Sequence, residues 1–150
     1  MLLNNNPMLK KILFVIGIGM MVLTLIDCKK DDAVDPDPLA PLVGVWNCTK
    51  ATRGGVAVDG YESFKLTLTG TSDASTFNYV AAGRPATSAW PASGTWKFGT
   101  NTATDIIRDA DLPVSYSVTD TQLELTFNYT GSGFARVGEV GGTWVFTFTK

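Results

Sequence analysis

The carboxylates best placed to do chemistry are gathered in one short stretch. Asp105, Asp109 and Asp111 follow one another closely, with Arg108 among them. Paired carboxylates can hydrolyse glycosidic bonds, and a carboxylate cluster can bind Ca²⁺. Aspartate also favours turns, because its side chain hydrogen-bonds to the nearby backbone. We favour this ordinary loop role and keep a carboxylate-based hydrolase acting on glycans as the alternative.

The rest of the composition argues against an active site. The chain has no histidine, which removes the commonest metal ligand and the commonest general base. Cys48 therefore has no histidine to activate it, and a lone buried cysteine behaves as a small apolar residue. Phosphate loops, Cys/His clusters and serine triads are also missing from the sequence. We expect no catalytic residue, no metal and no cofactor.

A pair of residues in a long loop is the best candidate for ligand binding. Arg84 and Trp90 lie in the segment AAGRPATSAWPASG, residues 81–94. An exposed tryptophan beside an arginine can bind sugars or peptides, because the ring face stacks on apolar faces of the ligand. We favour the other interpretation, in which the loop folds over the end of the domain with Trp90 as its lid, and keep Trp90 and Arg84 as the candidate ligand-binding residues.

Cys28 occupies a different chemical setting. Lys10 and Lys11 precede an uncharged apolar run at residues 12–26. As a helix this run is about 22 Å long, which is short for a hydrocarbon core of about 30 Å but well suited to a signal peptide. Cys28 follows directly, and charged residues at 29–32 come after it.

This arrangement resembles the lipobox of bacterial lipoproteins. Leu25 matches the leucine usual three residues before the cysteine, while Asp27 stands where a small residue is usual. The sequence KKDD at 29–32 resembles the start of surface lipoproteins of the Bacteroidota. The resemblance implies a signal peptide at 1–27, acylation (palmitate) of Cys28 and lipid anchoring at the outer membrane, on the cell surface. An uncleaved membrane anchor or a free thiol is the alternative, and a disulfide with Cys48 requires that acylation fails.

The remainder of the chain is patterned for β-strands. Residues 28–41 are rich in charge and proline and predict a flexible tether. From residue 42 to 150, apolar residues alternate with polar ones in about eight runs separated by Gly, Asp, Asn and Ser. We expect strands at 44–50, 62–70, 76–80, 94–99, 105–109, 114–118, 122–130 and 142–150. Short connections favour an antiparallel meander, closed as a barrel or folded as a β-sandwich.

The opening of the first run carries a second resemblance. Gly44 and Trp46 resemble the Gly-x-Trp opening of the first strand in lipocalins and lipocalin-like lipoproteins of the Bacteroidota. The resemblance implies an eight-stranded barrel that Trp46 closes at one end. Lipocalins also pack an arginine on this tryptophan, and Arg136 and Arg108 are the candidates for it here.

The expected interior and the net charge of the chain limit the classes of function that fit this domain. Twelve aromatic residues have the inward phase, which favours a filled core over a large cavity: Trp46, Phe64, Phe77, Tyr79, Trp96, Phe98, Tyr116, Phe127, Tyr129, Trp144, Phe146 and Phe148. The formal net charge of −2 gives no basic surface for nucleic acid. The sequence therefore predicts a noncatalytic surface lipoprotein that binds a small hydrophobic ligand, a glycan or a partner protein.

Overall fold

Residues 37–130 and 140–150 are the part of the chain described by the computed structural model. They belong to one of the two compact units into which the chain divides, residues 36–150. The predicted signal peptide at 1–27, the lipid attachment site Cys28 and most of the tether lie outside the described residues. Within the described residues, no helix has the length and apolar character needed to cross a membrane.

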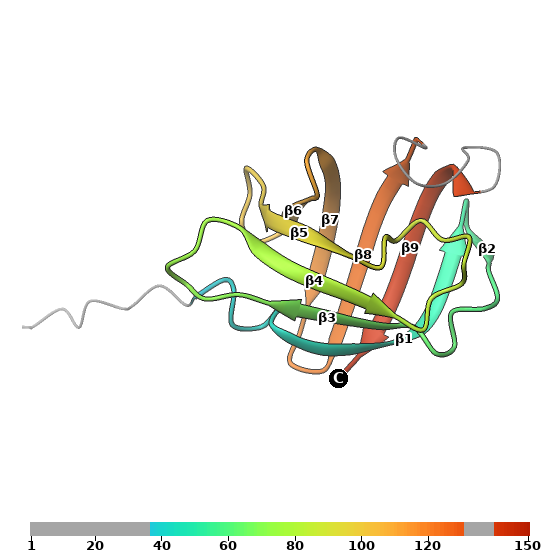
Figure 1. The fold of residues 1–150 in the computed structure, drawn as a ribbon, viewed down its shortest axis with the longest axis horizontal. Helices are drawn as coiled ribbons and strands as arrows, with labels where there is room; N and C mark the ends of the chain where they lie inside the picture. Colours follow the sequence, from blue (N-terminus) through green and yellow to red (C-terminus); the bar gives the residue numbers. More distant parts are fainter. Residues whose placement is uncertain (1–36, 131–139) are drawn as a thin grey trace, which may run out of the picture. The chain divides into compact units, whose positions relative to one another are not determined.

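The described residues form an antiparallel β-barrel (Figure 1). Its strands are β1 (Gly44–Arg53), β2 (Val56–Ala57), β3 (Lys65–Thr69), β4 (Phe77–Ala82), β5 (Ser93–Phe98), β6 (Asp105–Arg108), β7 (Leu112–Val118), β8 (Gln122–Tyr129) and β9 (Gly142–Thr149). Sequential neighbours pair from β3 to β9, and β1 pairs with both β3 and β9, which closes the sheet. The predicted eight-stranded barrel is confirmed, and the β-sandwich alternative is wrong.

The first strand is longer than its alternation predicts. The strand contains a β-bulge between Cys48 and Lys50, so that Thr49 and Lys50 are both exposed and burial resumes at Ala51. A bulge adds one residue to a strand and shifts the phase of the residues that follow it. The strict alternation therefore ends at the bulge although the strand continues to Arg53. The short strand β2, which the sequence analysis missed, pairs with the end of β1 through Thr52 and Arg53.

Aromatic side chains fill the barrel, as predicted. Of the twelve aromatic residues expected to point inward, all are buried except Phe98, which is partly buried against the core. Tyr61 and Trp90, both from loops, join the same core. Leu39 is buried as well, so the folded domain includes part of the segment that was predicted to be a tether.

Candidate functional site

The alternating strand directions place the connections at two ends of the barrel. One end carries the turn at 37–42 and the loops 70–76, 99–104 and 119–121; we call it the Trp46 end. The other end carries the loops 54–64, 83–92 and 109–111; we call it the Arg108 end. The two ends differ in whether their buried polar groups have hydrogen-bond partners.

At the Trp46 end, the first and last strands are tied together around one tryptophan. Trp46 is fully buried, and its indole N–H donates to the Leu42 carbonyl at 2.8 Å. The Lys150 ammonium lies 4.6 Å from the centre of the Trp46 ring and donates to the Pro41 carbonyl at 3.2 Å. Gly44 has a φ of 139°, and a side chain there would come within 3.3 Å of Lys150 Cε. The end is therefore closed with all of these polar groups paired.

The cation on Trp46 is not the one that the sequence analysis named. Arg108 packs on a different tryptophan, Trp90, and Arg136 lies outside the described residues. Lys150, which ends the chain just after β9, takes the position instead. Lysine and arginine both provide a cation for a ring face, and the sequence analysis considered only arginine.

A similar pair lies at the opposite end of the same two strands. Trp144, near the start of β9, donates its indole N–H to the Val140 carbonyl at 2.7 Å. Arg53, at the end of β1, places its guanidinium carbon 6.0 Å from the Trp144 ring centre. Each of the two strands thus begins with a Gly-x-Trp sequence whose ring meets a cation from the end of the other strand.

The Arg108 end contains a buried arginine inside the barrel. Arg108 is the last residue of β6 and shares the inward face of that strand with Ile106. Only 2% of Arg108 is exposed. Its guanidinium carbon lies 4.5 Å from the Trp90 ring centre and 4.8 Å from the Phe127 ring centre. Burial lowers the pKa of Arg108, and the Tyr79 hydroxyl and the Asp109 carboxylate oppose that shift.

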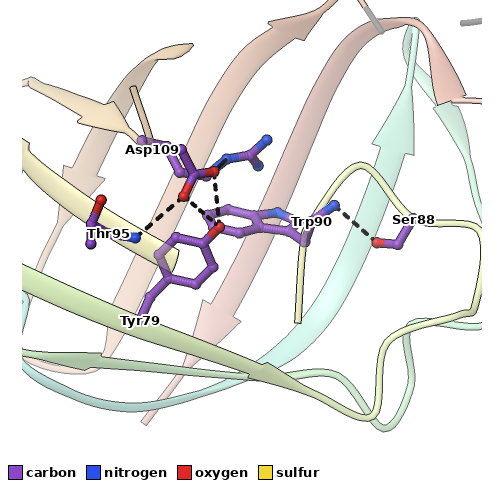
Figure 2. Close-up of polar contacts among 6 residues, drawn as sticks. Tyr79, Ser88, Trp90, Thr95 and Asp109 are labelled. Atoms are coloured by element: carbon purple, nitrogen blue, oxygen red, sulfur yellow. Dashed lines mark hydrogen bonds and ion pairs between the residues drawn. The ribbon is translucent and has the colours of Figure 1, made fainter. Parts of the chain in front are cut away.

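Asp109 turns away from the interior and is already committed to other donors. Its backbone has a φ of 56°. The Tyr79 hydroxyl donates to its two carboxylate oxygens at 3.1 and 3.0 Å, and the Thr95 N–H donates at 3.3 Å (Figure 2). Arg108 Nε lies 3.4 Å from Asp109 Oδ2, within ion-pair range. Asp109 thus offsets part of the arginine charge, while the hydrogen bonds that it accepts come from Tyr79 and Thr95.

Gly94 makes the contact between Tyr79 and Asp109 possible. A Cβ atom at this position would come within 2.1 Å of Asp109 Oδ1 and 2.6 Å of the Tyr79 hydroxyl oxygen. Any larger residue would therefore push the two groups apart. Burial is the main cause that raises the pKa of Tyr79, so the hydroxyl stays protonated and acts as the donor to Asp109.

Several buried donors at this end make no hydrogen bond with the described residues, although one of them, Arg108 Nε, lies within ion-pair range of Asp109. They are Nε and Nη1 of Arg108, Nε1 of Trp90 and Nε of Arg84; we call them the unpartnered donors. A buried donor without an acceptor costs about 1–3 kcal/mol, and more when the group is charged. Trp46, Trp96 and Trp144 each donate the indole N–H to a backbone carbonyl. Trp90 alone among the four tryptophans lacks such a bond.

The loop 83–92 inserts its middle into the core. Ser88, Ala89 and Trp90 are buried, whereas Ala86, Thr87 and Ala92 are exposed. The Trp90 ring lies edge-on to Tyr79, Phe127 and Phe146, with ring centres 5.4 to 6.2 Å apart. The ring is therefore part of the core, which agrees with the favoured interpretation of a loop folded over the barrel end with Trp90 as its lid.

Side-chain hydrogen bonds hold this loop. The Ser88 hydroxyl accepts from the Trp90 N–H at 3.1 Å (Figure 2) and lies 3.0 Å from the Tyr61 hydroxyl. Arg84 Nη1 donates to the Pro85 carbonyl of its own loop at 3.1 Å. Among the described residues, we find no hydrogen bond between Arg84 and Trp90, although the sequence analysis had paired them as one site. Arg84 and Arg108 both act on Tyr79 electrostatically. The charge of each guanidinium lowers the Tyr79 pKa, although burial raises it by more.

A shallow hollow adjoins the loop. It has a volume of about 180 Å³ and is lined by the β1 bulge, by β2 and by the segment up to Glu62, with Tyr61 in its wall. Because Tyr61 also contacts Ser88, the hollow borders the contact that holds the middle of the loop.

Asp105 and Asp109, two carboxylates of the hydrolase alternative, lie at opposite ends of β6. Asp105 begins β6 and Asp109 follows its last residue, which at about 3.3 Å per residue separates them by roughly 13 Å. The carboxyl groups of a glycosidase lie within roughly 5–9.5 Å of each other. Asp111 is exposed in the turn after Asp109. No group of metal-binding side chains is found in the part of the chain that the structure describes.

Cys48 is a free, buried cysteine. Burial raises the pKa of its thiol to about 11, against a smaller lowering by the Lys50 carbonyl, to which the thiol donates. The thiolate needed for nucleophilic chemistry is therefore scarce at neutral pH.

No protein-family model, curated protein or solved structure matches this chain. Function must accordingly be argued from the geometry. Arg108 lies inside the barrel, as its phase with Ile106 indicates, but it stacks on Trp90 and not on Trp46. The sequence gives no signal for the contact of Tyr79 with Asp109, because that contact depends on how distant strands meet.

Proposed function

We propose that this chain is a noncatalytic, lipid-anchored binding protein whose barrel takes a small ligand at the Arg108 end. One observation carries the proposal: a buried arginine stacks on Trp90 and Phe127, and within residues 37–130 and 140–150 two of its nitrogens make no hydrogen bond. Buried charges in folded proteins are normally paired and hydrogen-bonded. A cluster that bears this cost in the free protein is suited to a ligand that supplies the acceptors.

Room for the ligand comes from movement of the loop 83–92. Its buried residues are held by side-chain hydrogen bonds to Ser88, and exposed residues flank them. Ligand-binding loops are commonly parts of a fold that open locally, and contacts with the ligand would offset the lost burial of the Trp90 ring. A partial outward shift of Trp90 would open an aromatic-lined space beside Arg108 while the indole N–H stays at the edge of that space. Loops supported by a rigid barrel are also a common place for recognition.

The anchoring part of the proposal rests on the sequence. The short apolar run, Cys28 and the charged residues after it form a lipoprotein-like export signal. Acyl chains on Cys28 supply the anchor, because two lipid signals suffice for stable attachment to a membrane. The charged and proline-rich residues that follow would hold the barrel away from the bilayer.

The test is a binding screen on the full-length protein in lipid nanodiscs. Glycans and small apolar molecules, charged and uncharged, are titrated while tryptophan fluorescence is recorded, with empty nanodiscs as the blank. A ligand at the Arg108 end should change the emission of the wild type and give a smaller change in Trp90→Phe. Equal affinity and equal spectral change in the two proteins would place the ligand elsewhere. No binding across the panel would contradict the proposal and favour a protein partner.

A further inference from the structure

We infer that the ligand is an apolar molecule carrying a carboxylate group, and this inference rests on the function proposed above. The unpartnered groups at the Arg108 end are all donors: two on Arg108, one on Trp90 and one on Arg84. A complementary ligand must therefore present acceptors. A carboxylate offers two oxygens and about four acceptor positions in a plane.

Charge favours a carboxylate over a neutral acceptor. Two guanidinium groups, those of Arg84 and Arg108, act on the Tyr79 hydroxyl, while Asp109 is the carboxylate that hydrogen-bonds to it. Asp109 already accepts hydrogen bonds from Tyr79 and Thr95 and approaches Arg108 only at Nε. The Nη1 side of the Arg108 guanidinium thus remains for the ligand. The planar fork of arginine matches the geometry of a carboxylate.

The surroundings of the cluster define the rest of the ligand. Phe64, Tyr79, Phe127 and Phe146 surround the Trp90 ring, with ring centres 5.4 to 6.2 Å from it. These rings offer an apolar surface, and the Tyr79 hydroxyl is already bonded to Asp109. The part of the ligand beyond the carboxylate should therefore be apolar and of about the size of one or two rings.

Trp90 supports the same inference independently of Arg108. The other three tryptophans of the barrel each donate their indole N–H to a backbone carbonyl. A buried tryptophan N–H usually finds such a partner. The Trp90 N–H, beside the Arg108 guanidinium, is the exception. Two adjacent elements, β6 and the loop 83–92, thus present donors to one place.

The experiment uses probes that differ only in the head group. Full-length protein in lipid nanodiscs is dialysed against 1-naphthylacetate or 1-naphthylacetamide, and against octanoate or octanamide, with empty nanodiscs as the blank. We expect the acid of each pair to bind the wild type roughly 10- to 100-fold more tightly than its amide, as charge-assisted hydrogen bonds to a buried guanidinium provide. Arg108→Met should abolish this preference, and Arg108→Lys should keep part of it. Lys97→Met, which removes an exposed charge from neighbouring β5, should leave it unchanged.

Each contrary result has a distinct meaning. Equal binding of acid and amide to the wild type would overturn the carboxylate inference and leave the proposed binding function standing. A preference for the acid that survives in a folded Arg108→Met protein, as judged by thermal unfolding, would overturn the role of Arg108. If neither acid binds, the inference is wrong, and the proposed function fails with it only when the wider screen is also negative.

Discussion

The Lys150 ammonium lies 4.6 Å from the centre of the Trp46 ring, and it joins the end of the chain to the first strand of the barrel. Among the described residues, this is the cation–π contact found at the Trp46 end. It also fixes the turn at 37–42, because the same ammonium donates to the Pro41 carbonyl.

Trp46→Ala should therefore destabilise the protein strongly. The ring is fully buried and its N–H is paired, so we expect a loss of about 3–5 kcal/mol in the free energy of unfolding. Lys150→Met removes an exposed cation–π contact and the exposed hydrogen bond to the Pro41 carbonyl, and it should cost about 0.5–1 kcal/mol. Urea unfolding followed by circular dichroism measures both. A loss below about 1 kcal/mol for Trp46→Ala would show that this tryptophan does not close the barrel.

Arg108→Met, unlike Trp46→Ala, should not lower the free energy of unfolding. The variant removes a buried charge with unpartnered donors, and methionine fills similar space. Asp109 keeps its bonds from Tyr79 and Thr95 and is 38% exposed, so it is not stranded. We expect the free energy of unfolding to be unchanged or raised by about 1 kcal/mol. A loss above about 2 kcal/mol would assign Arg108 a structural role and remove the main support for the binding site.

Gly94→Ala tests the packing behind the cluster. The added methyl group would collide with Asp109 and with the Tyr79 hydroxyl, and overpacking of this kind costs roughly 1–3 kcal/mol. Ser93→Ala is the matched control, since Ser93 is an exposed neighbour on the same strand and should change stability by less than about 0.5 kcal/mol. Thermal unfolding of the two variants measures the difference. Equal stability would mean that Tyr79 and Asp109 do not meet above Gly94.

Cys48 should resist alkylation in the folded protein. With a pKa of about 11, only about a thousandth of the thiol is ionised at pH 8. Iodoacetamide labelling of the Cys48 peptide, followed by mass spectrometry, should be slow in buffer and fast in urea. Because the folded pKa lies above the ordinary value of 9.0, the unfolded state loses its proton first. This contribution to stability is complete below about pH 9 and is lost as the pH rises through about 11. Rapid labelling at pH 8 without urea would contradict the burial of the thiol.

Acylation at Cys28 is tested separately. Cells that express the protein are fed a clickable palmitate analogue, and the label should appear in wild type and Cys48→Ser but not in Cys28→Ser. Labelling of Cys28→Ser at the wild-type level would contradict lipid attachment at this residue. Digestion of intact cells by an added protease checks surface display.

Strand positions could be predicted from the sequence because a half-buried strand imposes a period of two on its side chains. Leu123, Leu125, Phe127 and Tyr129 show this pattern, and all four are buried in β8. The pattern stops being informative where the backbone departs from a regular strand, as at the bulge after Cys48. The exact ends of β1 therefore could not be read from alternation.

The candidate site was harder to predict for a related reason. Trp90 lies in a loop, where no period links burial to position, and its place depends on tertiary contacts with Tyr79 and Phe127. Arg108 did carry a signal, since it shares the phase of Ile106. The resemblance to lipocalins suggested Trp46 as its partner, whereas the actual partner, Trp90, lies in a loop. The Lys150 contact with Trp46 could not be predicted, because alternation within a strand does not show that β9 pairs with β1.

Closure of the sheet between β1 and β9 also has a kinetic consequence. Asn47 and Thr149, which face each other across this seam, are 102 residues apart in the chain. Such long-range pairing is slow to form, because the loop must be closed before the contacts compensate for its entropy. Until the seam forms, β1 and whichever strand is last in place present unpaired edges that can recruit other chains. Export in an unfolded state would thus leave a period in which aggregation competes with folding.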